Sequence, residues 1–195
     1  GPVQMTWRDA FEDQAHSCEA FGSPLTARVL RLVAGRIDPD DPVAIRLGAW
    51  RGDLSSRGES VALRLAGGLH GICLADPGCA LARAYRAADR MTDDALWSAL
   101  CDALGGERAR IMTALDHPPQ TNEVRRSVVL IALGHWLAAR FDLPLVLSEL
   151  GASAGLNLLW DRYGLALGTA RRGMPDAALV LGTDWDGPLP PETQP

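Results

Sequence analysis

The chain has 195 residues, of which 47% are hydrophobic and 22% are charged, and its formal net charge is -5. This balance excludes an intrinsically disordered protein, and the longest strongly apolar run, 128–139, is too short to cross a bilayer. The 19 basic residues are all arginine and form no basic stripe, so neither nucleic acid nor a membrane is an expected partner.

The cysteines and the first residues indicate where the protein works. Four cysteines stand without C-x-x-C spacing, and no histidine has metal-ligand spacing, so we expect reduced thiols, no metal and a cytoplasmic location. Residues 1–5 are expected to be a tag remnant and leader, because Gly1-Pro2 resembles the scar of a removed purification tag. His135 lies in an apolar helical run and is expected to be a hydrogen-bonded core residue.

Helical periodicity dominates residues 6–117, which we expect to form a helical domain. Thr6 is expected to cap a helix whose apolar face includes Phe11 and Phe21. Ser23-Pro24 then begins a second helix, with Ser as N-cap and Pro at the first position. After a turn at 38–42, further helices are expected at 43–50, 61–74, 80–89 and 95–115.

Residues 118–181 show a different pattern, which predicts an α/β unit. A helix at 122–141 is apolar nearly all round and should be buried. The apolar run 145–150 predicts a parallel-sheet strand, followed by a glycine turn, a helix at 156–163 and a second strand at 177–181. This order predicts the opening βαβ unit of a Rossmann-like, methyltransferase-like sheet.

The last residues of the chain are not expected to add strands to the predicted sheet, which therefore stays small. Residues 182–195 are rich in proline and glycine and are expected to be a tail or linker. A sheet of two or three strands leaves its edges and faces uncovered. We therefore expect the chain to be a fragment of a longer protein, or to pair with another molecule.

The sharpest motif is the segment 149–155, with the sequence Glu-Leu-Gly-Ala-Ser-Ala-Gly. Small residues permit a tight turn, the following helix offers unpaired amides, and the acidic residue can accept hydrogen bonds from an amino or hydroxyl group. The motif resembles the cofactor loop of S-adenosylmethionine-dependent methyltransferases. That resemblance implies S-adenosylmethionine as cofactor, and the residues that would hold it are Glu149, Gly151, Ala152, Ser153 and Gly155.

The same letters allow two other interpretations. They spell G-x-S-x-G, the nucleophile elbow of α/β-hydrolases, in which Ser153 would attack the substrate. No histidine follows His135, so a Ser-His-acid triad would need an unusual order. Alternatively, the turn is only structural and the protein is a non-enzymatic interaction module.

A polar segment precedes the 122–141 helix and could share a pocket with the glycine turn. If the helix reverses directly into the 145–150 strand, the start of one and the end of the other lie at the same end of the layer. Helix capping explains part of the polar segment. The candidates for facing a methyl acceptor are Gln120, Asn122, Glu123 and Asn157, with Thr121 beside them.

Three charged residues have open roles. Arg126 could pair with Glu123 or with a bound carboxylate. Asp176 and Asp184 lie near the end of the second expected strand, at a spacing compatible with a ribose-binding acid.

Segments 118–124 and 150–158, together with Trp160-Asp161-Arg162-Tyr163, resemble a bacterial family known only as domain of unknown function 2332. The opening segment 11–24 is similar as well. The family has no established activity, and the resemblance implies longer members with more sheet after 184–188. The leading hypothesis is a methyltransferase-like enzyme that binds S-adenosylmethionine or a related small nucleotide-like ligand.

Overall fold

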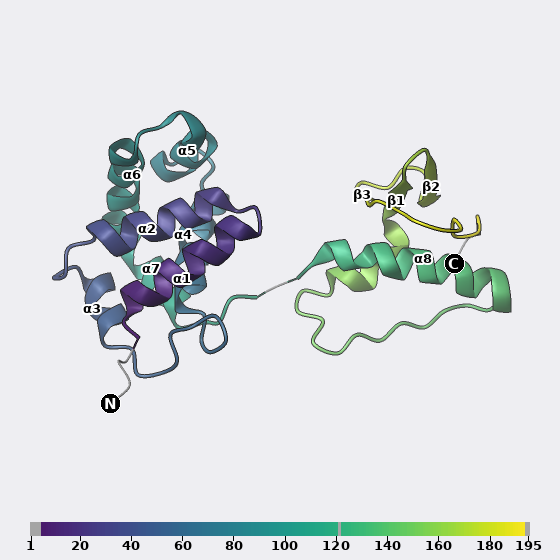
Figure 1. Cartoon of the computed structure of the whole chain (residues 1–195), viewed down its shortest axis with the longest axis horizontal. Coiled ribbons are helices and arrows are strands. Elements are labelled where there is room, and N and C mark those ends of the chain that lie inside the picture. Colours follow the sequence, from purple (N-terminus) through teal and green to yellow (C-terminus); the bar gives the residue numbers. More distant parts are fainter. Residues whose placement is uncertain (1–4, 121, 194–195) are drawn as a thin grey trace. The chain divides into compact units, whose positions relative to one another are not determined.

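The computed structural model describes residues 5–120 and 122–193. The chain divides into two compact units, residues 1–119 and 120–195, and each has its own hydrophobic core. The first unit is helical, and the second combines a long helix with a small sheet (Figure 1). Of the expected tag remnant and leader, only Met5 lies within the described residues.

The first unit confirms the expectation of a helical domain. Its helices are α1 (Trp7–Ala20), α2 (Pro24–Arg36), α3 (Pro42–Gly48), α4 (Val61–Ala75), α5 (Ala80–Arg86), the short 3-10 helix η1 (Ala88–Arg90), α6 (Asp93–Gly106) and α7 (Arg108–Leu115). The single helix expected over 95–115 is in fact two, because Glu107 leaves helical geometry between α6 and α7. No single helix in the described part of the chain is long and apolar enough to cross a membrane.

The helix starts follow the capping residues of the sequence. Thr6 and Asp9 form a reciprocal capping box at α1, and the Thr92 hydroxyl accepts the Ala95 amide at α6. Pro24 occupies the first turn of α2 after Ser23, as predicted, although the Ser23 side chain makes no capping bond. At α1 and α6, therefore, local side-chain hydrogen bonds mark where the helix starts.

The core of the first unit is a single apolar cluster to which α1, α2, α4, α6 and α7 all contribute. Its largest fully buried side chains are Phe11, Leu30, Leu47, Leu65, Leu69, Leu81, Leu96, Leu100, Ile111 and Leu115. Phe21 is an exception to the predicted apolar face of α1, since it is 89% exposed. It follows the last helical residue, so the period that buries Phe11 no longer applies to it.

The second unit contains a mixed sheet instead of the purely parallel one expected. Its elements are η2 (Val124–Arg126), α8 (Ser127–Phe141), η3 (Leu156–Arg162), β1 (Gly164–Leu167), β2 (Ala170–Gly173) and β3 (Val180–Gly182). β1 is central, antiparallel to β2 and parallel to β3. The strand expected at 177–181 appears as β3, shifted toward the C-terminus, and the β1–β2 hairpin was not predicted.

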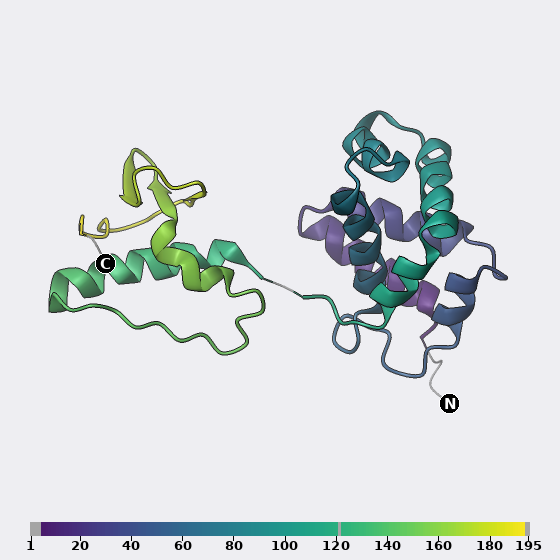
Figure 2. The same cartoon turned by 180° about the vertical axis from the view of Figure 1, so that it is seen from behind.

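The strand expected at 145–150 does not form with the described residues. This segment runs back in the direction opposite to α8, and both views draw it without a strand arrow (Figures 1 and 2). A strand is defined by ladder hydrogen bonds to a neighbour, and no described strand lies beside this segment to provide them. The helix expected at 156–163 is correspondingly the tighter 3-10 helix η3.

Helix α8 is buried on one face only, which corrects the expectation of burial all round. Val128, Ile131 and Ala132 belong to the core of the second unit, together with Trp160 of η3 and Leu165 of β1. The opposite face exposes three large apolar side chains at helical spacing: Val129, Leu133 and Trp136.

His135 joins α8 to the sheet, as a hydrogen-bonded core residue. The Gly173 amide donates to His135 Nε2 at 3.1 Å, and His135 Nδ1 lies 2.9 Å from Thr193 Oγ1 and accepts the Thr193 amide at 3.3 Å. The ring is buried, and burial, assisted by the positive charge of Arg172, lowers the pKa of His135 below its ordinary value. The fold therefore requires the neutral imidazole.

We expect acid to destabilise the second unit through His135. Because its folded-state pKa is lowered, its contribution is fully present above the unfolded pKa of 6.5 and is lost as the pH falls below that value. The free energy of unfolding should decrease between pH 7.5 and 5 by at most about 1.4 kcal/mol per pH unit. Denaturant unfolding at a series of pH values measures this slope. His135→Gln should flatten it, and His16→Gln, at an exposed position, should not.

Candidate functional site

The structure brings the polar segment before α8 into contact with the glycine turn. The Asn122 side chain bridges the turn: its Nδ2 donates to the Ala152 carbonyl at 3.0 Å, and its Oδ1 accepts the Leu156 amide at 3.1 Å. The Ser153 hydroxyl donates to Gln120 Oε1 at 3.1 Å. Thr121 lies outside the described residues. The two segments that the sequence placed at one end of the layer thus share one hydrogen-bonded cluster.

The turn has an unusual backbone, in which left-handed residues alternate with ordinary ones. Gly151, Ser153 and Gly155 have φ of 68°, 53° and 72°. Glycine takes this conformation without cost, whereas Ser153 pays about 1 kcal/mol or more for it. The amides of residues 151–154 donate no hydrogen bond to any described group. Successive amides in alternating geometry form concave sites that bind anionic or oxygen-bearing ligands.

Beneath the turn lies a buried polar network. The Ser127 hydroxyl donates to Asn157 Oδ1 at 2.9 Å, and Asn157 Nδ2 is 3.4 Å from Glu149 Oε1. Ser127 and Asn157 are both buried, with Asn157 3% exposed. Glu149 Oε2 is buried as well and has no hydrogen-bond partner among the described groups. A buried carboxylate oxygen without a donor is costly, so this atom is a point where a ligand donor would be stabilising.

Glu123 stands apart from this cluster. Its Oε2 accepts from Arg126 Nε at 2.9 Å, and both side chains are exposed. Of the two partners considered for Arg126, the structure therefore shows Glu123. An exposed pair of this kind contributes little stability and leaves both groups accessible to solvent.

The structure gives Asp176 and Asp184 no part in the cluster. Both residues are exposed, and neither carboxylate makes a hydrogen bond or an ion pair with a described residue.

The surroundings of Ser153 differ from those of a hydrolase nucleophile. Its hydroxyl donates to the Gln120 carboxamide, which has no basic atom to accept a proton. His135 has both ring nitrogens engaged, with Gly173 and Thr193. Within the described ranges no histidine contacts Ser153, so the Ser-His contact on which that chemistry depends is not made.

Two residues of the cluster were not found from the sequence. Ser127 is fully buried and orients Asn157, and Tyr163 donates its hydroxyl to the Leu156 carbonyl at 2.7 Å. The available signal for Ser127 was a single hydroxyl at the start of an apolar helix. Capping also explains a serine there, so the pattern alone does not reveal the contact.

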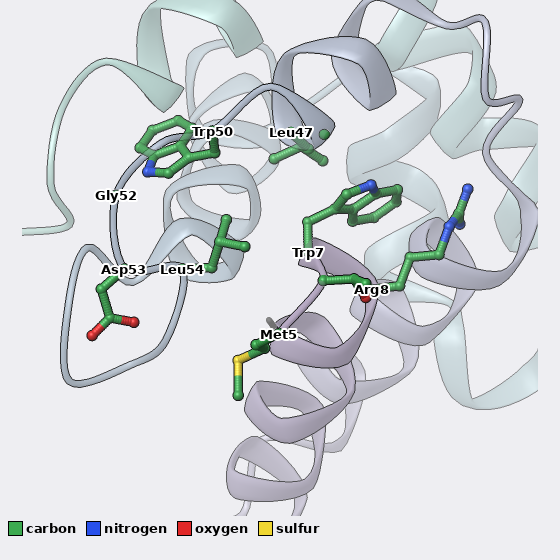
Figure 3. A pocket seen from close by; sticks show the side chains of 10 residues that line it. Met5, Trp7, Arg8, Leu47, Trp50, Gly52, Asp53 and Leu54 are labelled. Carbon is green, nitrogen blue, oxygen red and sulfur yellow. The ribbon is translucent and has the colours of Figure 1, made fainter. Parts of the chain in front are cut away.

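The first unit has a separate cleft of about 610 Å³ between the start of α1 and the loop that follows α3. Figure 3 shows Trp7, Leu47 and Leu54 around it, whereas the charged ends of Arg8 and Asp53 point away. Arg8 lies over the Trp7 ring and donates to the Ala34 carbonyl. The lining of the cleft is thus mixed, and the charged ends of Arg8 and Asp53 do not converge in it.

Comparisons with known proteins identify a family but no activity. A family model described as "Uncharacterized protein conserved in bacteria (DUF2332)" matches residues 8–195. No curated protein and no solved structure matches the chain. Since the family model spans nearly the whole sequence, the chain belongs to this uncharacterised bacterial family, DUF2332, which its motifs resemble.

Proposed function

We propose that the second unit binds S-adenosylmethionine, or a closely related nucleotide-like small molecule, at the glycine turn 149–155, and that the protein is a cytoplasmic methyltransferase-like enzyme. The proposal depends above all on one observation. Glu149 Oε2 is buried and unpaired, at the point where the motif requires an acceptor for a ligand hydroxyl or ammonium group.

The residues around Glu149 support such a ligand. Asn157 holds Oε1 and thereby leaves Oε2 as the atom available to a ligand donor. The backbone amides of residues 151–154 are hydrogen-bond donors, which complement the Glu149 acceptor and are suited to a carboxylate or a ribose oxygen. A zwitterionic methionine moiety next to a ribose carries both sorts of group. Donor and acceptor groups within one short turn therefore match this ligand class.

Asn122 restricts where the ligand can lie. Its Oδ1 already accepts the Leu156 amide, so the start of η3 is not free to bind an anion. The ligand would therefore contact the outer side of the turn, at 151–154, and not the helix end. In this arrangement Asn122 and Asn157 are positioning residues, whose hydrogen bonds hold the turn and Glu149 in place.

A Rossmann-type arrangement of segment 145–150 is part of the proposal.

When bound, the sulfonium group of S-adenosylmethionine supplies the methyl group for transfer to an acceptor. The protein's task is to orient that acceptor, and no acid or base is essential for it. Gln120, next to Ser153 at the rim, and the exposed Glu123 are the candidates for contacting the acceptor.

Isothermal titration calorimetry with S-adenosylmethionine and S-adenosylhomocysteine tests the binding. We expect saturable heat with one site per chain. Absence of heat with both compounds, from protein shown to be folded by circular dichroism, would contradict the proposed function.

A matched pair of variants locates the site. Gly151 and Gly168 both have left-handed φ, and a Cβ added at either meets no atom within 4 Å. Valine at either position therefore introduces the same backbone strain. We expect Gly151→Val to weaken binding at least about tenfold, equivalent to 1.4 kcal/mol, and Gly168→Val, in the β1–β2 turn, to leave it unchanged. Equal losses in both variants would place the ligand elsewhere.

A further inference from the structure

The first unit has another cleft, an apolar groove of about 580 Å³ that is lined by residues of α2, α4 and α5 and that we call the α4 groove. One face of α4 forms a wall of it, with four residues at helical spacing: Leu63, Ala66, Gly67 and His70. From α2 it includes Val29, which is buried in the first core. The groove therefore reaches the core, and its volume lies within the range of roughly 300–1,000 Å³ for small-molecule sites.

Gly67 leaves space in the middle of this wall. A Cβ added at Gly67 would meet no atom within 4 Å, whereas a Cβ at its neighbour Gly68 would come within 2.7 Å of the Ala114 Cβ. Helix packing therefore requires glycine at 68 but not at 67. A larger side chain at 67 fits the helical backbone without strain and would occupy the groove.

Two hydrogen-bond donors of the groove have no partner in the described part of the protein. Tyr85 packs partly buried against the first core, and its hydroxyl makes no hydrogen bond with a described residue. Burial raises the pKa of this hydroxyl, so it stays protonated and is a donor. Arg86, the next residue, is exposed and makes no hydrogen bond or ion pair with a described residue. Both groups are therefore available to an acceptor.

The charge of the lining determines which kind of acceptor fits. Among the described residues that line the α4 groove there is an arginine and no aspartate or glutamate. The cleft at the start of α1 differs, because both Arg8 and Asp53 line it. The chain as a whole carries a net charge of -5, so the positive end of the α4 groove is a local feature. An apolar wall with one positive end complements a molecule that has an apolar body and one negative group.

We propose that the α4 groove binds a medium-chain aliphatic carboxylate, with the chain against α4 beside Gly67 and the carboxylate hydrogen-bonded to Arg86 and Tyr85. The planar guanidinium of arginine matches the two oxygens of a carboxylate, and a phenol adds a third donor. Burial of the chain against the apolar wall provides the hydrophobic part of the binding. The site uses residues of the first unit only, so the inference does not depend on the cofactor proposed for the glycine turn.

Calorimetric titration of the full chain with octanoate tests this proposal, and 1-octanol is the matched uncharged probe. We expect octanoate to bind saturably at one site per chain and 1-octanol to bind at least about tenfold more weakly. Gly67→Leu should weaken octanoate binding at least about tenfold, because the side chain fills the groove. Gly105→Leu is the control, since Gly105 is also an exposed helical glycine with free space at its Cβ but lies in α6, outside the lining.

A second pair of variants tests the carboxylate contact. Arg86→Gln should weaken octanoate binding at least about tenfold and leave 1-octanol binding unchanged. Arg90→Gln removes the same charge from an exposed arginine outside the lining and should change neither. Absence of octanoate binding by protein that circular dichroism shows to be folded would overturn the proposal. Equal losses in Arg86→Gln and Arg90→Gln, or undiminished binding in Gly67→Leu, would overturn the assignment of the ligand to this groove.

Discussion

Phe11→Ala should destabilise the first unit by about 3–5 kcal/mol, the range for removing a fully buried aromatic ring. Phe11 has no exposed surface and lies on the face of α1 that joins the core shared with α2 and α4. Its ring also meets Trp7 edge-to-face, with centroids 5.1 Å apart and planes at 80°. Such an aromatic pair adds about 0.5–1.5 kcal/mol beyond burial, so the loss should lie toward the upper end.

Phe21→Ala is the control for Phe11→Ala. It removes the same ring from the residue that follows α1, where the ring is almost fully exposed, and should change stability by less than about 0.5 kcal/mol. Urea unfolding measures both variants, and peptide-resolved hydrogen exchange shows whether the loss is confined to residues 1–119. Similar losses in the two variants would mean that the buried face of α1 is assigned wrongly.

The contrast between these two phenylalanines shows what the sequence determines in the first unit. Helix starts depend on neighbours three residues apart, as in the Thr6–Asp9 box, so they can be predicted from short stretches. Phe21 follows the same spacing as Phe11, but the helix ends at Ala20. The break at Glu107 directly follows Gly105-Gly106, which weaken a helix, but the apolar periodicity continues across them and predicted a single helix.

Strands were predicted less well, because a strand needs a partner that its own sequence does not specify. Segment 145–150 has the apolar character of a parallel-sheet strand but finds no ladder partner among the described residues. Strand β2, in contrast, contains Arg171 and Arg172 and has little strand character, yet it pairs with β1 across the turn at Gly168. Tertiary pairing here overrides intrinsic preference.

For the site, the sequence predicted which segments meet but not how they meet. The helix predicted at 122–141 and the extended segment after it run in opposite directions and have comparable lengths. Asn122 and the glycine turn are therefore expected at the same end. Which atoms form each hydrogen bond depends on differences of a few ångströms in side-chain position. Asn122, considered as a group facing an acceptor, instead uses both ends of its amide on the turn.

Asn157→Ala should destabilise the second unit by about 2–4 kcal/mol, although it removes only a small polar side chain. The Ser127 hydroxyl, which is fully buried, would lose its acceptor, and Glu149 Oε1 would lose the donor 3.4 Å away. Each buried polar group left without a partner costs about 1–3 kcal/mol, and more when it is charged. Asp161→Asn, an isosteric change at an exposed position of η3, should alter stability by less than about 0.5 kcal/mol.

The Asn157 variant also separates a structural role from a positioning role. If Asn157 serves only the fold, a second substitution, Ser127→Ala, should restore part of the lost stability, because no buried hydroxyl is then left unpaired. If Asn157 also positions Glu149, S-adenosylhomocysteine binding should stay weak in the double variant even where stability recovers. Urea unfolding and calorimetry on the two single variants and the double variant measure both quantities. Recovery of binding together with stability would show that Glu149 does not need Asn157 to meet a ligand.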